Sequence, residues 1–288
     1  AMDEIWTAPD TYNFRFLDFA ATFARENNMN VRGTHLIWHG QAPAWIQTGA
    51  YTEAQLSDLL ETYISSVMRH CDTEFPGVVN AWNVANEVVA HDGSGLRDTV
   101  FTQTLGADFL DDLFLWADSA SPDTALYLNE YGILGNATDN QTKADTLYGI
   151  VTDLVDRGVP IDGVGFQAHM AIDEELDIEY CRSQIQRFAA LGLTVQITEF
   201  DVLVNNDATG ITDTKREDQA EMIGDLVQLC VSEPGCSGVT FWGVSDALHD
   251  VNTGNADWLE QSRDWPLLYD HAYEAKPAYF SVRTALGG

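Results

Sequence analysis

The chain has 288 residues, 45% of them hydrophobic, which is enough for one large globular domain with a substantial core. Its 14 Lys and Arg residues oppose 45 Asp and Glu residues, and the formal net charge of −31 argues against nucleic acid or an anionic membrane as a partner. No apolar run approaches the roughly 18 residues of a membrane-spanning helix. Because no linker, repeat or low-complexity tract is visible, we predict a single domain over residues 1–288. We expect it to be a monomer, although no feature of the sequence determines the oligomeric state.

Segments with helical and with strand periodicity alternate along the chain. In chain order they are a helix over 14–27, a strand over 31–39, a helix over 52–70 that opens with a Thr52–Gln55 capping box, a strand over 78–84, a helix over 108–120, a strand over 124–128, a helix over 143–157, a strand over 161–166, a helix over 175–191, a strand over 193–201, a helix over 216–231, a strand over 238–242 and a helix over 276–286. The first helix carries Phe16, Phe19, Ala20 and Phe23 on one face. This alternation predicts a parallel sheet with helices packed outside it.

The number of strand–helix units is smaller than a closed barrel requires. Six strand–helix pairs follow the first helix, whereas a closed (β/α)₈ barrel has eight. Residues 1–5 are interpreted as the remnant of a seventh strand, and nothing in the chain supplies the first unit. We therefore expect either that an upstream segment completes the barrel or that residues 1–11 fold across the gap.

Two glutamates follow buried strands at positions where barrel enzymes keep their active sites. Glu199 ends the strand that begins at Leu193, and Glu87 follows the strand over 78–84. Because the carboxyl ends of parallel strands meet at one edge, these two carboxyl groups can face each other, which is what glycoside hydrolysis needs. Other strand ends carry residues that can stack on sugar rings or bond hydroxyl groups: Trp38, His39, Asn129, Tyr131, Gln167, His169 and Trp242.

At these strand ends the sequence resembles a known family of enzymes. Residues 82–87, Trp-Asn-Val-Ala-Asn-Glu, are similar to the acid/base motif of glycoside hydrolase family 10, the endo-β-1,4-xylanases. Residues 197–201, Ile-Thr-Glu-Phe-Asp, resemble the nucleophile motif of that family. Further similar blocks occur in the family's order at residues 32–33, 36–41, 127–131, 163–169, 238–243 and 276–279.

The resemblance implies a (β/α)₈ barrel that hydrolyses β-1,4-xylan with retention and takes xylo-oligosaccharides. Glu199 would be the nucleophile and Glu87 the acid/base, with carboxyl groups about 5–5.5 Å apart. His169 would bond Glu199 and be held in turn by Asp201. Asn86 would bond the sugar 2-hydroxyl. The expected substrate-binding set is Trp38, His39, Gln41, Asn86, Asn129, Tyr131, Gln167 and Trp242.

The chain also departs from the family pattern. The family commonly has His-Thr where this chain has Thr34-His35, and Asp where this chain has Asn83, so we expect Thr34 and Asn83 to keep a hydrogen bond without a charge. A second tryptophan that is usual after Trp242 is replaced in the region of residues 249–251, and Trp258 is a candidate substitute. Binding on the glycone side is therefore the part of the site that the sequence leaves open.

The cysteines point to an oxidising compartment. Cys230 and Cys236 lie on either side of the residues Ser232-Glu233-Pro234-Gly235, whose turn would let them form a disulfide. Cys71 and Cys181 are expected to be free thiols in the core. A local disulfide predicts a secreted or periplasmic protein.

Other functions stay open at this stage. A carbohydrate-binding barrel without turnover is one alternative, and a retaining β-glycanase of another specificity is a second. Taken singly, Glu87 or Glu199 is equally well read as a strand-end carboxylate in a salt bridge, and His169 as a core histidine. The His, Asp and Glu spacings match no metal site, so we predict no metal and no cofactor.

Overall fold

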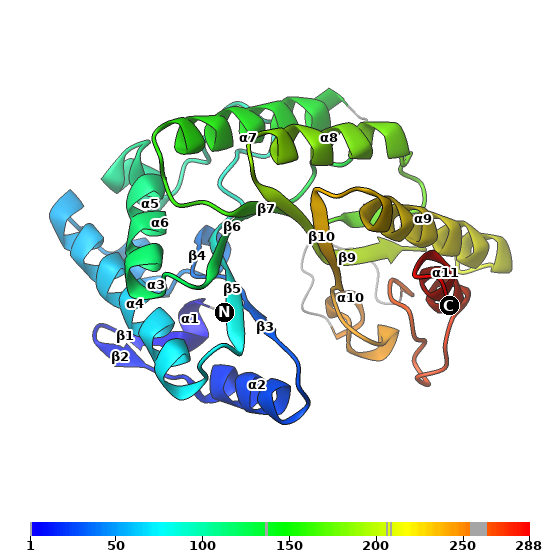
Figure 1. Ribbon diagram of the computed structural model, residues 1–288, viewed down its shortest axis with the longest axis horizontal. Coiled ribbons are helices and arrows are strands. Elements are labelled where there is room, and N and C mark those ends of the chain that lie inside the picture. Colours follow the sequence, from blue (N-terminus) through cyan, green and yellow to red (C-terminus); the bar gives the residue numbers. More distant parts are fainter. Residues whose placement is uncertain (1, 136–137, 206, 208, 254–263) are drawn as a thin grey trace. The chain divides into compact units, whose positions relative to one another are not determined.

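The computed structural model describes residues 2–135, 138–205, 207, 209–253 and 264–288 (Figure 1). The chain divides into two compact units, one formed by residues 1–130 and 145–164 and the other by residues 131–144 and 165–288. Helix α7 (Thr138–Asp156) and strand β7 (Gly163–Phe166) each contribute residues to both units. Among the described residues, no helix is long and apolar enough to span a membrane.

The first unit is built on parallel strands around β5 (Val79–Asn86). Strand β6 (Ala125–Glu130) pairs with β5, and so do β3 (Val31–Gly33) and β4 (Ile37–Trp38). The last six residues of β5 are all buried, as expected for a parallel strand that is covered on both faces. The single strand expected over 31–39 is in fact these two short strands, and a 3-10 helix, η1 (His39–Gln41), follows β4.

Three helices of this unit were predicted from the sequence: α2 (Arg15–Glu26), α4 (Glu53–Glu74) and α6 (Phe109–Ala120). The short helices α3 (Ala44–Thr48) and α5 (Val100–Leu105) were not expected. The predicted capping box opens α4, because Thr52 Oγ1 accepts from the Gln55 amide at 3.3 Å and Gln55 Oε1 accepts from the Thr52 amide at 3.0 Å. Helix α4 buries Leu56, Leu60 and Ile64 at helical spacing and lies beside α6 (Figure 1).

The first residues form a helix and a hairpin instead of a strand remnant. Met2–Ile5 is helix α1, and strands β1 (Trp6–Ala8) and β2 (Thr11–Tyr12) pair antiparallel. The expectation of a strand over residues 1–5 was therefore wrong. The physical reason is Trp6, whose buried ring stacks on Tyr63 of α4 with ring centroids 4.6 Å apart, so the segment is fixed against a helix.

Helix α2 presents its phenylalanine stripe to solvent. Phe16, Phe19 and Phe23 are 57%, 73% and 54% exposed, whereas Ala21 and Ala24 on the opposite side are buried. The amphipathic pattern of this helix was predicted correctly. The structure adds that the small alanine face packs inward, and that the described residues leave the larger apolar face open.

The second unit is built around β9 (Thr194–Leu203), which pairs in parallel with β8 (His169–Ala171) and β10 (Cys236–Phe241). Its helices are α8 (Ile178–Ala190), α9 (Asp213–Ser232) and α11 (Pro277–Ala285), with the short η2 (Asp246–Leu248) and α10 (Asp250–Thr253) after β10. Helix α9 packs against α11 (Figure 1). Strand β8 was not expected from the sequence.

The cysteine predictions are confirmed. Cys230 at the end of α9 and Cys236 at the start of β10 form a disulfide. Cys71 and Cys181 are free and buried, and burial raises the pKa of each thiol to about 12, so both are inert at neutral pH.

Candidate active site

Strand register in the first unit aligns three of the expected substrate-binding residues. Trp38 of β4 pairs with Asn86 of β5, and Asn86 pairs with Asn129 of β6. Both asparagines are buried, and Asn129 Nδ2 donates to Asn86 Oδ1 at 2.8 Å. The amide of Asn86 is therefore held in one orientation, as recognition of a sugar hydroxyl requires.

Glu87 follows β5 in an uncommon backbone conformation. Its φ of 55° lies in the left-handed region, which costs a residue with a side chain about 1–3 kcal/mol and is tolerated where surrounding bonds impose it. The backbone amide of Glu87 donates to the backbone carbonyl of Asn129 at 2.9 Å, and the backbone carbonyl of Glu87 accepts from Arg97 Nε at 3.0 Å. The strand thus ends abruptly at a half-buried carboxyl group.

Glu130, at the end of β6, supports the segment after Glu87. Its side chain is fully buried, and its Oε2 accepts from the Val89 amide at 3.0 Å. Neither Glu130 nor Arg97 was chosen from the sequence as a site residue. Glu130 did lie inside one of the family-like blocks, whereas no local signal marked Arg97.

An aromatic and polar pocket surrounds Glu87. Trp38, His39, Asn86, Glu87 and Arg97 are among its lining residues. The rings of Trp38 and His39 are half-buried, with centroids 6.1 Å apart in an edge-to-face arrangement. An apolar ring face beside a carboxyl group and amides is the composition expected of a sugar site. Gln41, the last residue of η1, is exposed.

The expected hydrogen bond between the two departures from the family pattern is present. Asn83 Nδ2 donates to Thr34 Oγ1 at 3.2 Å. The structure adds a third partner, because Arg32 Nη1 donates to Asn83 Oδ1 at 2.6 Å. The guanidinium of Arg32 also lies over the Tyr127 ring, 4.0 Å from its centroid. Burial lowers the pKa of Arg32, against the opposing effect of Tyr127.

Strand register in the second unit brings together the other expected catalytic residues. His169 of β8 pairs with Asp201 of β9, and Glu199 lies two residues before Asp201 on the same face of β9. His169 Nε2 lies 3.1 Å from Glu199 Oε2, and His169 Nδ1 lies 2.9 Å from Asp201 Oδ2. These are the contacts that the sequence predicted for His169.

The charges in this cluster fix the protonation of His169. Burial opposes the charged form, but Asp201 and Glu199 outweigh it and raise the pKa of His169 to about 10. Burial likewise opposes ionisation of Asp201, yet His169 and His249 hold the pKa of that carboxyl below its usual value. At neutral pH the cluster is an imidazolium that donates to buried carboxylates, so the orientation of Glu199 is set by charge-assisted bonds.

Two further predicted residues of this unit, Trp242 and Gln167, contact that cluster. Trp242 follows β10, and its half-buried ring lies edge-to-face with the His169 ring at 6.0 Å. Gln167 is buried, and its backbone carbonyl accepts from the backbone amide of Glu199 at 3.0 Å. Tyr131 is half-buried, and Lys143 Nζ lies 3.1 Å from its ring centroid.

His249 is a member of the cluster that sequence reasoning missed. It lies in the segment where the family resemblance placed a tryptophan, is 4% exposed, and has its Nε2 2.9 Å from Asp201 Oδ2. A single histidine in a loop gives no periodic or spacing signal that could have identified it. Trp258, the suggested substitute for the tryptophan, lies outside the described residues.

The part of the chain that the structure describes contains no group of three or more His, Cys, Asp or Glu residues suited to a metal ion. The site has instead the components of acid–base and nucleophilic chemistry: carboxyl groups at strand ends, an imidazolium and aromatic faces. The prediction that no cofactor is used stays a prediction.

Comparison with known proteins extends the likeness to nearly the whole chain. The family model for glycosyl hydrolase family 10 matches residues 1–285. Endo-1,4-beta-xylanase B of Thermotoga neapolitana is 30% identical over 98% of this chain and 76% of its own length. Endo-1,4-beta-xylanase 1 of Humicola insolens is 32% identical over 96% of this chain and 60% of its own length.

A solved structure gives the same result for the fold. Xylanase 10B from Thermotoga petrophila, determined in complex with xylobiose, superimposes with a TM-score of 0.90 at 32% identity and covers 100% of this chain and 83% of its own. This likeness confirms the predicted fold class, a (β/α)₈ barrel.

Proposed function

Because the chain belongs to glycosyl hydrolase family 10, we infer that it is a retaining endo-β-1,4-xylanase, which hydrolyses internal xylosidic bonds of xylan. The observation that carries this conclusion is the family match over residues 1–285, with glutamates at both of the family's motif positions. The arrangement of His169 and Asp201 around Glu199 supports it.

The reaction is a double displacement. Glu199 attacks the anomeric carbon as the glycosidic bond breaks, and a glycosyl-enzyme forms while Glu87 gives its proton to the leaving oxygen. Glu87 then takes a proton from water, which attacks the anomeric carbon and releases Glu199 with net retention. The imidazolium of His169 donates to Glu199 Oε2 and so holds the nucleophile in one rotamer.

Substrate binding is assigned to the aromatic and amide groups around the two glutamates. Asn86, held by Asn129, is positioned to bond a hydroxyl of the sugar ring, and Trp38 and Trp242 offer ring faces and edges for packing. The relative solved with xylobiose supports xylo-oligosaccharides as the ligand class. His39, Gln41, Tyr131 and Gln167 complete the proposed set.

Azide rescue of two variants tests the assignment of roles. Glu199→Ala should abolish hydrolysis of xylan, and azide should restore turnover of an activated aryl xyloside with an inverted azide product. Glu87→Ala should keep activity on the aryl xyloside, because a good leaving group needs no proton. The azide product of this variant should have the retained anomeric configuration. The matched control is Glu217→Ala on the exposed face of α9, which should behave as wild type.

Three outcomes would contradict the proposal. If both variants gave azide products of the same configuration, the nucleophile and acid/base roles would be wrong. If the wild-type chain bound xylotriose and released no reducing sugar from xylan, the alternative of a carbohydrate-binding barrel would be correct. Turnover of a β-glucan in place of xylan would indicate a β-glycanase of different specificity.

We further propose that the protein functions as a monomer outside the cytosol, without nucleic acid or membrane as a partner. The Cys230–Cys236 disulfide supports an oxidising compartment, and the net charge of −31 supports the exclusion of anionic partners. Light scattering at assay concentration tests the oligomeric state.

A further inference from the structure

His249 contacts the catalytic cluster, although the reaction scheme gives it no role. It lies between η2 and α10 in the segment after β10, and its side chain is buried. Its Nε2 lies 2.9 Å from Asp201 Oδ2, the same oxygen that lies 2.9 Å from His169 Nδ1. One carboxylate oxygen therefore accepts from two imidazole rings that come from different elements.

The other ring nitrogen of His249 identifies its tautomer. The Val251 amide donates to His249 Nδ1 at 3.3 Å. A backbone N–H can only donate, so Nδ1 must present its lone pair and the ring proton must lie on Nε2, facing Asp201. His249 is thus a neutral donor, in contrast to His169, which donates from both nitrogens as an imidazolium.

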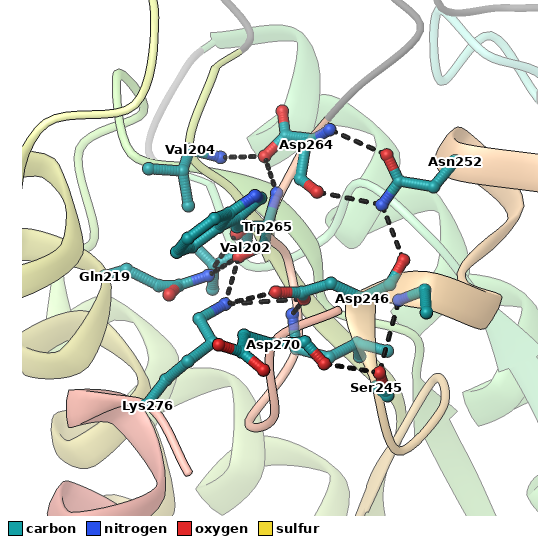
Figure 2. Close-up of polar contacts among 12 residues, drawn as sticks. Val202, Val204, Gln219, Ser245, Asp246, Asn252, Asp264, Trp265, Asp270 and Lys276 are labelled. Carbon is teal, nitrogen blue, oxygen red and sulfur yellow. Dashed lines mark hydrogen bonds and ion pairs between the residues drawn. The ribbon is translucent and has the colours of Figure 1, made fainter. Parts of the chain in front are cut away.

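The segment that carries His249 is fixed on its N-terminal side by a buried ion pair. Asp246, three residues before His249, has its Oδ2 3.1 Å from Lys276 Nζ (Figure 2). Its Oδ1 accepts from the backbone amide of Leu267 at 2.8 Å. Asp246 and Lys276 are 0% and 4% exposed. A buried pair of this kind contributes geometric definition more reliably than net stability.

On its C-terminal side the same segment is tied to β9. Asn252 exchanges two hydrogen bonds with the backbone of Asp264, each 2.8 Å long (Figure 2). The Asp264 carboxylate accepts from the Val204 and Asn205 amides at 2.7 and 2.9 Å, directly after the end of β9. The segment on both sides of His249 is therefore anchored, and β9 carries Asp201 and Glu199.

We propose that His249 is a positioning residue for the xylanase reaction, whose neutral Nε2–H holds the carboxylate of Asp201 and, through His169, orients Glu199. This rests on the proposed function. With His169 as its single donor, the Asp201 carboxylate would be free to rotate about its side-chain bond. A second donor from an anchored segment fixes that rotation without adding a positive charge that would compete with His169 for the carboxylate.

The tautomer is tested without any assay of turnover. Nitrogen–proton correlation spectra of the histidine side chains, recorded near neutral pH and assigned with His249→Gln and His169→Gln variants, should show His249 neutral with its proton on Nε2. The same spectra should show His169 as an imidazolium. An imidazolium at His249, or a proton on its Nδ1, would overturn the proposal. This measurement remains decisive even if the chain proves not to be a xylanase.

Kinetics test the positioning role. His249→Leu removes the donor, and His249→Gln keeps an N–H close to the position of Nε2. We expect His249→Leu to lose about 10- to 100-fold in kcat, with KM for a xylo-oligosaccharide changed far less, since a small misorientation of the nucleophile acts on the chemical step. His249→Gln should recover most of that loss. The matched control is Leu248→Ala, because Leu248 adjoins His249 and is 68% exposed.

Two kinetic results would contradict the proposal. Equal kcat for His249→Leu and wild type would show that Asp201 needs no second donor. Equal losses in His249→Leu and His249→Gln, with both variants folded by circular dichroism, would show that the N–H is not what matters. If His249→Leu does not fold, the kcat of His249→Gln and the tautomer of His249 in the nitrogen–proton spectra still test the proposal. Absence of xylan hydrolysis by the wild type would instead contradict the proposed function.

Discussion

At the scale of single residues, Asp201 connects catalysis to stability. Its carboxylate keeps His169 protonated, because the pKa of His169 rises to about 10 against an ordinary value of 6.5. A group whose pKa is raised by folding stabilises the folded state fully below its unfolded pKa, and this stabilisation is lost as the pH rises through the folded value. The relevant window therefore runs from about pH 6.5 to about pH 10.

The first prediction concerns this window. Asp201→Asn removes one of the two carboxylates that raise the pKa of His169, so the variant should lose less stability than wild type between pH 7 and pH 10. The measurement is the free energy of unfolding by urea at several pH values. The variant should be less stable at pH 7, and the difference should shrink toward pH 10.

The control for this prediction is Asp207→Asn. Asp207 pairs with Lys215 at 2.6 Å, and the hydrogen bond from Lys215 lowers the pKa of Asp207 to about 2. A lowered carboxyl pKa affects stability only as the pH falls through the acid range. Above pH 7, the free energy of unfolding of Asp207→Asn should therefore change with pH in the same way as that of wild type. If the free energy of unfolding of Asp201→Asn also changed with pH in the same way as that of wild type, His169 would not be protonated as described.

A second residue-scale prediction concerns Asn83, which is buried between Thr34 and Arg32. We expect Asn83→Asp to stabilise the protein by about 1 kcal/mol at neutral pH, because the Arg32 bond becomes charge-assisted. Thr34 can then donate its hydroxyl proton to the new carboxylate. The gain should disappear as the pH falls below about 4, since a carboxyl with a lowered pKa loses its contribution on protonation.

Thermal melts of three variants measure this effect. Asn83→Leu, which removes the acceptor from Arg32, should cost about 1–3 kcal/mol and provides the matched comparison. If Asn83→Asp were as unstable as Asn83→Leu, Arg32 would not neutralise the new charge. The double variant Thr34→Ala with Asn83→Asp should show whether the threonine hydroxyl is needed.

At the scale of elements, local signals predicted the long segments well. The capping box located the start of α4, and glycines at 158 and 192 with φ of 73° and 84° close the turns after two predicted helices. Strand β9 was expected because β-branched and apolar residues alternate with polar ones before Glu199. These features depend on neighbours in the sequence, so the sequence alone contains them.

Short elements were not predictable in the same way. Strand β8 has three residues, begins after Ala168 with a φ of 62°, and exists because it pairs with β9. The break between β3 and β4 likewise follows from pairing with β5, and the segment of α1 and β1 is held by the contact of Trp6 in β1 with Tyr63 of α4. Such elements are defined by partners far away in the chain, and periodicity over three to five residues carries too little information.

The same distinction applies to the candidate site. Glu87, Glu199 and His169 could be chosen because they stand at strand ends within recognisable blocks. His249 is separated from Asp201 by 48 residues, and only the fold reveals their contact. Arg97 was missed for the same reason, since it reaches the Glu87 carbonyl from the following loop.

The element-scale prediction concerns the exposed stripe of α2. Phe19 is 73% exposed, so Phe19→Ser should change the free energy of unfolding by less than about 0.5 kcal/mol. Phe114→Ala in α6 should cost about 3–5 kcal/mol, because Phe114 is fully buried. Urea unfolding of both variants gives the comparison. A loss of about 2 kcal/mol or more in Phe19→Ser would mean that this stripe is covered in solution.

At the scale of the whole molecule, the net charge of −31 is the dominant electrostatic feature. Helix α9 illustrates how the charge is distributed, because Asp213, Glu217, Glu221 and Asp225 follow one another at intervals of four residues. Like charges at this spacing destabilise a helix by about 0.2–0.5 kcal/mol per pair at low ionic strength. Glu217, Glu221 and Asp225 are all exposed, so dissolved salt can screen their repulsion.

The last prediction follows from this repulsion. The melting temperature should rise between about 0.05 M and about 1 M sodium chloride, where the Debye length falls to about 3 Å and exposed carboxylates cease to repel one another. Each kcal/mol of relieved repulsion should add about 2–4 °C to the melting temperature of a domain of this size.

Glu221→Lys provides the control, since it turns two repulsive contacts on α9 into attractive ones. Its melting temperature should exceed that of wild type at low salt, and its rise with salt should be smaller, because salt then screens attraction as well as repulsion. A flat or falling melting temperature in the wild type would show that self-repulsion does not limit stability. If the melting temperature of Glu221→Lys rose with salt as much as that of wild type, the repulsion that salt relieves would lie elsewhere than on α9.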